Sequence, residues 1–431
     1  MRVHARLRSV VTAVVGAVLA FVGILVLGAG LLFDAVYYAG LPVWLHTVAG
    51  LLALAPGLLL LLRALVRLPR RLARLWVRRR VFVLLPVGLG VVLVVSAQLW
   101  HALRPLPPVP GASRVAVAYL LEALSLMESR YGGSDQVPWP SVRAAALARI
   151  VNAKSPRDTY PAIRHALADI HDRHSFLFAP HELERMAHPA PSTPAPRPYS
   201  SKPFGRLTDE HLAYVLVPAH VGTGWGSVYF LNDSSGREYA QALRTLLRDL
   251  DAERPLGWVV DLRTNVGGNM WPMLDGLGPL LGEGRISAIL MPQWDRRVDT
   301  WIVAGQASSG PPWFGGLGLR RPETLLLRTA SAPVAVLVGP RTASSGEAVA
   351  VAFRGRPNTY FVGAPTAGLA TSTMSLSLPD GAELLLAIGY LADRTGRQYE
   401  GPIAPDAQVP TTKGRDETYL VASRWILSRP R

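Results

Sequence analysis

The chain has 431 residues, of which 49% are hydrophobic and 17% are charged, and it contains no cysteine. This composition excludes an intrinsically disordered chain, a disulfide framework, a thiolate metal site and a cysteine nucleophile. The net charge of +15 is uneven, because residues 1–104 hold twelve arginines and one acid whereas the remainder is nearly balanced. A basic face on the folded part is therefore not indicated, and we expect no nucleic acid partner.

Three long uncharged stretches open the sequence. They cover residues 10–33, 41–62 and 81–100, and each is long enough to cross the roughly 30 Å hydrocarbon core of a bilayer as a helix. A secretory signal peptide is the alternative for the first stretch, but its apolar run is longer than a signal peptide's core and two further stretches follow. We therefore predict a membrane domain at residues 1–103 with three transmembrane helices that contact lipid.

The arginines around these stretches predict their orientation. Three arginines precede the first stretch and eight lie between the second and the third, whereas residues 34–40 hold no base. Arginine-rich loops remain in the cytoplasm, so the residues that follow the third stretch are expected outside. The sequence thus predicts a multi-pass protein of the cell membrane with an extracytoplasmic soluble part.

The soluble part begins with a stiff proline-rich linker at residues 104–112 and a helical subdomain at 113–186. A second proline-rich segment, 187–205, is expected to be a surface loop. From 206 to 412, short apolar strands alternate with helices, which indicates an α/β core with both sheet faces covered. This core includes an expected hairpin around residues 374–388, and a final helix is expected within 413–431.

The strongest chemical signal lies in residues 341–348 (RTASSGEA), between an apolar strand and a helix. The free N–H groups at a helix start point to one place, so a serine there lies beside donors for an oxyanion. Ser344 is therefore the candidate nucleophile. The alternative is a helix cap, because Ser344 and Glu347 have the S-x-x-E spacing of a capping box, and the two roles are compatible.

A glycine-containing turn ends residues 258–270 (WVVDLRTNVGGNM), which begin as an apolar strand. Gly267 and Gly268 allow positive φ and close backbone approach, which suits an amide donor to an oxyanion. A phosphate-binding turn is the alternative, but neither a G-x-G-x-x-G nor a Walker pattern is present.

Two further segments carry titratable side chains. Residues 171–178 (HDRHSFLF) contain His174, whose imidazole could accept a hydroxyl proton near neutral pH or could instead interact with a helix end. A metal site with His171 is less favoured, because the spacing is not H-E-x-x-H and no third ligand is evident. In residues 399–406 (YEGPIAPD), Glu400 could hold an imidazole and Asp406 could cap a turn.

Together these four segments resemble the carboxyl-terminal processing, or tail-specific, serine proteases, and among them the nisin-resistance and tricorn branches. The matching elements are D-x-H-S/T at 172–175, D-L-R-x-N-x-G-G at 261–268, S/T-A-S-x-x-E at 342–347 and E-G-x-x-x-P-D at 400–406. The resemblance covers about residues 113–412. It implies a crotonase-like, or ClpP-like, α/β protease core that follows a helical subdomain.

Two departures from the family pattern matter. Many members insert a PDZ domain before the core, but residues 181–211 are too few here for even a small domain of ~50 residues. Many members also use a lysine base on the strand after the nucleophile, and Leu369 occupies that position in this chain. The nisin-resistance and tricorn branches instead use a histidine, which His174 matches.

The resemblance implies a serine endopeptidase in which Ser344 attacks, His174 accepts its proton and Glu400 orients the imidazole. The oxyanion would be held by backbone N–H groups of Ser345 and of Gly267 or Gly268, with no metal or organic cofactor. The expected partner is a peptide or protein substrate. A non-catalytic binding protein on the same fold, or an esterase or amidase with the same serine, is the alternative.

Overall fold

The computed structural model describes residues 106–187, 202–220, 234–309, 325–410 and 415–430. The three predicted transmembrane helices and the arginine loop between them lie outside these residues, as does most of the proline-rich segment 187–205. Within the described part of the chain, no helix combines the length and the apolar character needed to cross a membrane.

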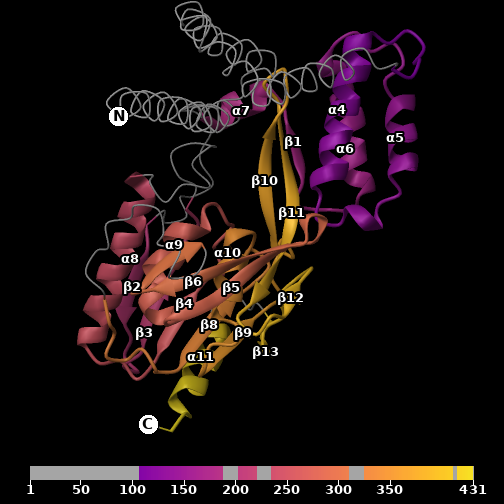
Figure 1. Ribbon diagram of the computed structural model, residues 1–431. Coiled ribbons are helices and arrows are strands. Elements are labelled where there is room, and N and C mark those ends of the chain that lie inside the picture. The colour runs from indigo at the N-terminus through magenta and orange to yellow at the C-terminus, as the bar shows by residue number, and fades with distance from the viewer. Residues whose placement is uncertain (1–105, 188–201, 221–233, 310–324, 411–414, 431) are drawn as a thin grey trace, which may run out of the picture.

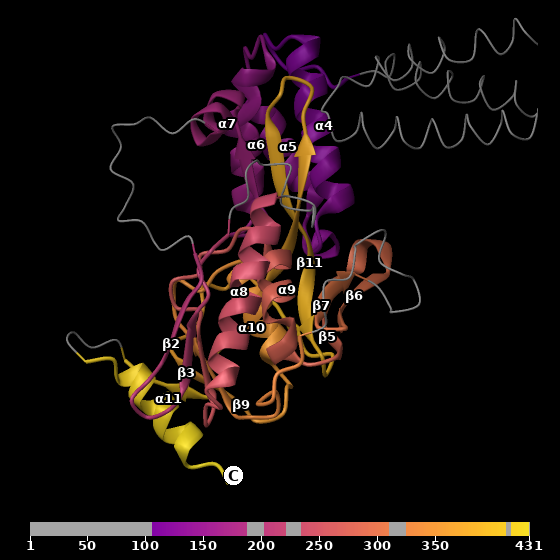
Figure 2. The same cartoon turned by 90° about the vertical axis from the view of Figure 1, so that its left-hand side faces the viewer.

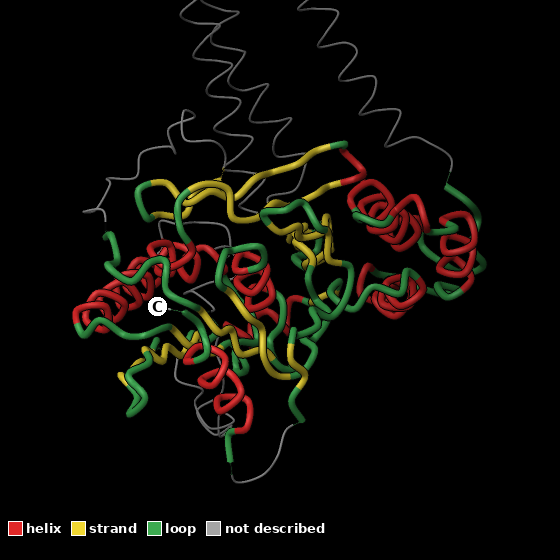
Figure 3. Tube along the Cα trace, turned by 90° about the horizontal axis from the view of Figure 1, so that it is seen from below, coloured by secondary structure: helices red, strands yellow, loops and turns green. Residues whose placement is uncertain are grey.

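The described chain begins with a bundle of three helices, α4 (Arg114–Arg130), α5 (Trp139–Ala148) and α6 (Tyr160–Asp169). Ser113 caps α4, because its hydroxyl accepts the N–H of Ala116 at 3.1 Å. Seen from below, the three helices stand as a cluster beside the layers of the core (Figure 3). A short helix, α7 (Pro180–Ala187), follows β1.

A mainly parallel sheet forms the centre of the core, with the strand order β13-β9-β8-β4-β3-β2. Only β2 runs antiparallel to its neighbour, as expected for an edge strand. The central strands β4 and β8 are buried at every position, which agrees with their continuous apolar sequence. The strands are β2 (Phe204–Leu207), β3 (Ala213–Leu216), β4 (Trp258–Asp261), β8 (Val334–Val338), β9 (Thr359–Gly363) and β13 (Ala407–Gln408).

Helices cover both faces of this sheet, so the sequence expectation of an α/β core is confirmed (Figures 1 and 2). On one face lie α8 (Ser234–Ala252), α9 (Met270–Leu281) and α10 (Ser345–Phe353), whose apolar side chains share the largest hydrophobic cluster with β4 and β8. The opposite face is covered by α11 (Glu417–Leu427). This last helix lies in the segment 413–431 where a helix is predicted.

A second, antiparallel sheet has the order β1-β11-β5-β6-β7, and β10 and β12 also pair with β11. Its hairpin of β10 and β11 is the one expected around residues 374–388. Neither β1 nor the pair β6 and β7 is anticipated by the sequence patterns. The strands are β1 (Phe176–Phe178), β5 (Gly284–Met291), β6 (Arg296–Val303), β7 (Gln306–Ser309), β10 (Thr371–Ser377), β11 (Glu383–Asp393) and β12 (Gln398–Tyr399).

The hairpin of β10 and β11 reaches out of the core and packs along the helix bundle (Figure 2). Leucines from both of its strands belong to the same hydrophobic cluster as α4, α5 and α6. At its tip, the carboxylate of Asp380 accepts the hydroxyls of Tyr119 and Tyr160 at 2.7 and 2.6 Å. Apolar packing and the hydrogen bonds of Asp380 therefore hold the bundle against one long hairpin, whose other end lies in the core.

Candidate active site

Ser344 lies at the turn between β8 and α10, where it is the residue that precedes the helix. Its backbone has φ +51° and ψ −118°, a conformation that residues other than glycine rarely adopt. A strained turn from strand to helix can raise a serine side chain above the sheet edge. Ser344 is accordingly half-buried, although it directly follows the buried residues Thr342 and Ala343.

The imidazole of His174 lies within hydrogen-bond distance of the Ser344 hydroxyl. Its Nε2 lies 3.0 Å from Oγ of Ser344, and the histidine is only 6% exposed. The helix α6 ends at Asp169, so His174 lies past the helix end and not on its last turn. The structure therefore brings together the two residues for which we predict nucleophile and base.

The loop that carries His174 is held by its neighbours. Asp172 accepts the backbone N–H of His174 at 3.1 Å and also accepts the hydroxyl of Ser175. The hydroxyl of Ser175 in turn accepts the N–H of Ala387 in β11 at 2.9 Å. These bonds explain the acid and the hydroxyl residue of the D-x-H-S element, because they attach the base to the hairpin.

The other ring nitrogen of His174 is not in contact with Glu400, the partner that we predict for it. Its Nδ1 lies 2.7 Å from the hydroxyl of Thr371, the first residue of β10. Glu400 and His174 line one cavity, which is described below, but the exposed carboxylate of Glu400 accepts an N–H of Gln398 at 2.7 Å. The residue beside Nδ1 is therefore Thr371 and not the expected Glu400, because the carboxylate at the turn after β12 bonds to Gln398 and faces solvent.

Burial also sets the protonation of His174. Removal of the ring from water lowers its pKa below the usual value, and the nearby charge of Asp172 opposes this effect only in part. The neutral ring, which is the form able to accept a proton, is therefore favoured near neutral pH.

The glycine turn approaches the serine as expected. A Cβ atom on Gly267 would lie 2.8 Å from Cβ of Ser344, and the residue has φ +111°, so only glycine fits. However, the N–H of Gly267 donates to Oδ1 of Asn265 at 3.0 Å. Of the two predicted glycine donors, Gly267 is therefore already engaged, and Gly268 is the better candidate.

Ser345 contributes more than the backbone amide that the sequence suggests. It is the first residue of α10, where N–H groups have no partner within the helix. Its hydroxyl also donates to the carbonyl of Gly268 at 2.5 Å. A hydrogen bond therefore links Ser345 and Gly268, the two residues whose backbone N–H groups are candidate oxyanion donors.

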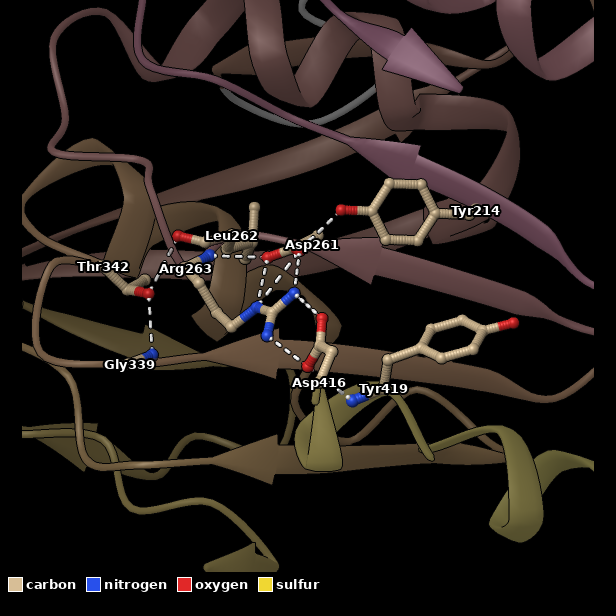
Figure 4. Close-up of polar contacts among 8 residues, drawn as sticks. All are labelled: Tyr214, Asp261, Leu262, Arg263, Gly339, Thr342, Asp416 and Tyr419. Carbon is tan, nitrogen blue, oxygen red and sulfur yellow. Dashed lines mark hydrogen bonds and ion pairs between the residues drawn. The ribbon is translucent and has the colours of Figure 1, made fainter. Parts of the chain in front are cut away.

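Asp261 and Arg263 of the D-L-R motif belong to a network of ion pairs and hydrogen bonds below the glycine turn (Figure 4). Arg263 forms ion pairs with Asp261 at 2.6 Å and with Asp416, the cap residue of α11, at 2.7 Å. The hydroxyl of Tyr214 donates to Asp261 at 2.7 Å. Because the side chain of Arg263 is largely covered, this network fixes the end of β4 and therefore the glycine turn that follows it.

Thr342 connects the two turns of the site. Its hydroxyl donates to the carbonyl of Leu262 at 2.9 Å and accepts the N–H of Gly339 at 3.0 Å (Figure 4). The strand end that leads to the glycine turn is thereby bonded to the segment that leads to Ser344. This bond accounts for the threonine of the T-A-S motif.

A cavity of about 280 Å³ opens on the imidazole side of the pair. It is lined by residues from the loops that follow α4 and α6, from the hairpin and from residues 400–402, and these include His174, Thr371 and Glu400. Within the described residues, no group of three or more His, Cys, Asp or Glu side chains is arranged to hold a metal ion.

An α/β core that sets a strained serine against a buried imidazole has the arrangement of a serine hydrolase. Residues 220–409 match peptidase family S41. The nisin-resistance protein of Lactococcus lactis subsp. lactis is 27% identical over 312 residues, which are 72% of this chain and 87% of that protein.

Solved structures resemble the chain in fold. A lipoprotein from Streptococcus agalactiae superimposes with a TM-score of 0.56 at 23% identity, over 76% of this chain and 99% of that one. For the photosystem II D1 C-terminal processing protease the TM-score is 0.48 at 16% identity, over 69% and 93% of the two chains. The chain is a serine-type peptidase, and the match of residues 220–409 to peptidase family S41 confirms the resemblance to the carboxyl-terminal processing proteases.

Proposed function

We propose that this peptidase is an endopeptidase that works through Ser344 and His174. The observation that carries the proposal is the 3.0 Å contact between Ser344 Oγ and His174 Nε2 at a strained turn beside two tethered amide donors. An imidazole at this distance is in reach of the hydroxyl proton, and its burial favours the neutral ring.

In the proposed reaction, Oγ of Ser344 attacks the carbonyl carbon of the scissile peptide bond and its proton passes to Nε2 of His174. The negative carbonyl oxygen is stabilised by the N–H groups of Gly268 and Ser345, each typically worth about 2.7–4 kcal/mol in the barrier. His174 then returns the proton to the leaving amine. A water molecule, deprotonated by the same ring, hydrolyses the acyl-enzyme and restores the hydroxyl.

We also propose that the peptidase is anchored in the cell membrane with its catalytic part outside the cytoplasm. The support is the sequence of residues 1–103, which contains three apolar stretches. Arginines precede the first stretch and fill the segment between the second and the third. These stretches would contact lipid. The substrate would then be an exported peptide or an extracytoplasmic part of a membrane protein.

A test of the proposed nucleophile is labelling by a fluorophosphonate, which reacts with activated serines. We expect the wild type to be labelled and Ser344→Ala to be unlabelled. Ser113→Ala is the matched control, because Ser113 also caps a helix and is remote from the site. Equal loss of labelling in both variants, or labelling of Ser344→Ala, would show that Ser344 is only a helix cap. Mapping of newly formed protein termini with and without Ser344 then separates a peptidase from an esterase.

A further inference from the structure

We propose that Thr371 is the positioning residue that accepts the Nδ1 proton of His174 and orients the ring, in the place that a carboxylate takes in the Ser-His-Asp arrangement. The inference rests on the proposed function, since it assigns a partner to the proposed base. The hydroxyl of Thr371 lies 2.7 Å from Nδ1, while Nε2 lies 3.0 Å from Ser344. The two ring nitrogens thus have different partners, one on the hairpin and one on the core.

The proton count explains why this contact matters. A neutral imidazole carries one ring proton, on either Nδ1 or Nε2. His174 can take the proton of Ser344 only if Nε2 is bare, so the ring proton must lie on Nδ1. In that tautomer the hydroxyl oxygen of Thr371 accepts the Nδ1 proton, and this bond stabilises the tautomer and fixes the direction of Nε2.

The loop of the base and the proposed partner Thr371 are both attached to the hairpin of β10 and β11. Thr371 pairs with Tyr390 across β10 and β11, and Ala387 of β11 donates to Ser175, the residue next to His174. The imidazole and the threonine hydroxyl are therefore attached to one hairpin. A change at Thr371 that kept its shape would leave this framework in place and remove only the acceptor.

The test compares Thr371→Val, which keeps the shape but removes the hydroxyl, with Thr371→Ser, which keeps the hydroxyl. Thr373→Val is the matched control, since Thr373 is a half-buried threonine of the same strand. The full chain is treated with a fluorophosphonate at several concentrations. The measurements are the labelling rate at saturation and the concentration that gives half of it.

We expect Thr371→Val to lower the saturating rate about 10–100-fold, part of the 10²–10⁴-fold that a general base contributes. The half-saturating concentration should change by less than about twofold, because Thr371 acts through His174 and not on the probe. Thr371→Ser should restore most of the rate, and Thr373→Val should match the wild type.

Wild-type labelling in Thr371→Val would overturn the role of Thr371 and leave the proposed function intact. Equal loss in Thr371→Val and Thr371→Ser would also overturn it, because the loss would then follow the methyl group. If the valine variant fails to fold, Thr371→Ala replaces it, and an alanine variant as fast as Thr371→Ser would be equally decisive. No labelling of the wild type would instead overturn the proposed function itself.

Discussion

The backbone N–H of Ser344 donates to Oε2 of Glu347 at 3.0 Å. Ser344 and Glu347 form a capping box with both of its reciprocal bonds, and the hydroxyl of the same serine also lies 3.0 Å from Nε2 of His174. The carboxylate also accepts the hydroxyl of Thr366 and the N–H groups of Gly368 and Leu369. Glu347 therefore holds both the serine turn and the loop in which Leu369 replaces the family's lysine.

This four-donor arrangement predicts that Glu347→Gln is destabilising. Glu347 is fully buried, and each of its oxygens accepts two donors. In glutamine an amide nitrogen, itself a donor, replaces one of the two carboxylate oxygens. The two donors at that position then lose their acceptor, and a buried unpaired donor costs about 1–3 kcal/mol. We expect a lower unfolding temperature in a thermal melt. Glu210→Gln is the control, because Glu210 is an exposed residue whose carboxylate accepts the hydroxyl of Tyr419 at the surface, and an equal change in both variants would contradict this reasoning.

Ser345→Ala should lower activity to an intermediate level. Alanine keeps the backbone amide but loses the hydroxyl that holds the carbonyl of Gly268. We expect a loss of roughly tenfold, well below the 10²–10³-fold cost of removing an oxyanion donor altogether. The rate of fluorophosphonate labelling measures this loss. A rate equal to that of the wild type would mean that the bond between Ser345 and Gly268 does not support the oxyanion site.

The lowered pKa of His174 predicts the pH dependence. The ring acts as a base only when neutral, so activity should fall as the pH drops through its pKa, which lies below 6.5. The same shift affects stability. The unfolded chain takes up the proton first, so the contribution of the neutral buried ring is complete above pH 6.5 and is lost as the pH falls toward the folded pKa.

A pH profile of the labelling rate tests this prediction. We expect an acidic limb with its midpoint below 6.5 in the wild type, and loss of nearly all activity in His174→Ala. Glu400→Gln should leave the limb where it is, because the carboxylate bonds to Gln398 and not to the ring. A limb that moves in Glu400→Gln would restore Glu400 as the partner of the imidazole.

Gly267→Ala should disrupt the site by steric conflict. The new methyl group would lie 2.8 Å from Cβ of Ser344 and 3.1 Å from the carbonyl of Ala343. Gly396→Ala is the matched control, because Gly396 also has positive φ but a Cβ atom there would have no neighbour within 4 Å. We expect Gly396→Ala to cost about 1 kcal/mol and Gly267→Ala to cost more and abolish labelling. Equal melting temperatures and equal labelling in Gly267→Ala and Gly396→Ala would contradict the close approach of Gly267 to Ser344.

The arginine distribution predicts the membrane topology. A reporter fused after Arg431 should be active only outside the cytoplasm, whereas one inserted within residues 68–80 should be active only inside. Enzymes that work in only one of the two compartments supply the measurement. Cytoplasmic activity of the C-terminal fusion would contradict both the topology and the extracytoplasmic location.

Sequence reasoning could identify those parts of the site that depend on neighbours along the chain. The buried strands β4 and β8 are continuous apolar runs, and each ends in a polar turn that the residue types mark. Ser344, Gly267 and Gly268 lie in the turns that follow these strands, so their place at one sheet edge is set by local order. The predicted hairpin depends in the same way on the turn at Asp380 and Gly381.

Tertiary structure alone decided which groups meet His174. Thr371 is 197 residues away along the chain and carries no local signal, since it reaches Nδ1 only because β10 packs beside the loop after α6. Glu400 matches a family motif, yet its side chain is exposed and bonds to Gln398. The N–H of Gly267 is likewise taken by Asn265. A buried polar group takes whichever partner packing brings within about 3 Å, and spacing along the chain does not determine that distance.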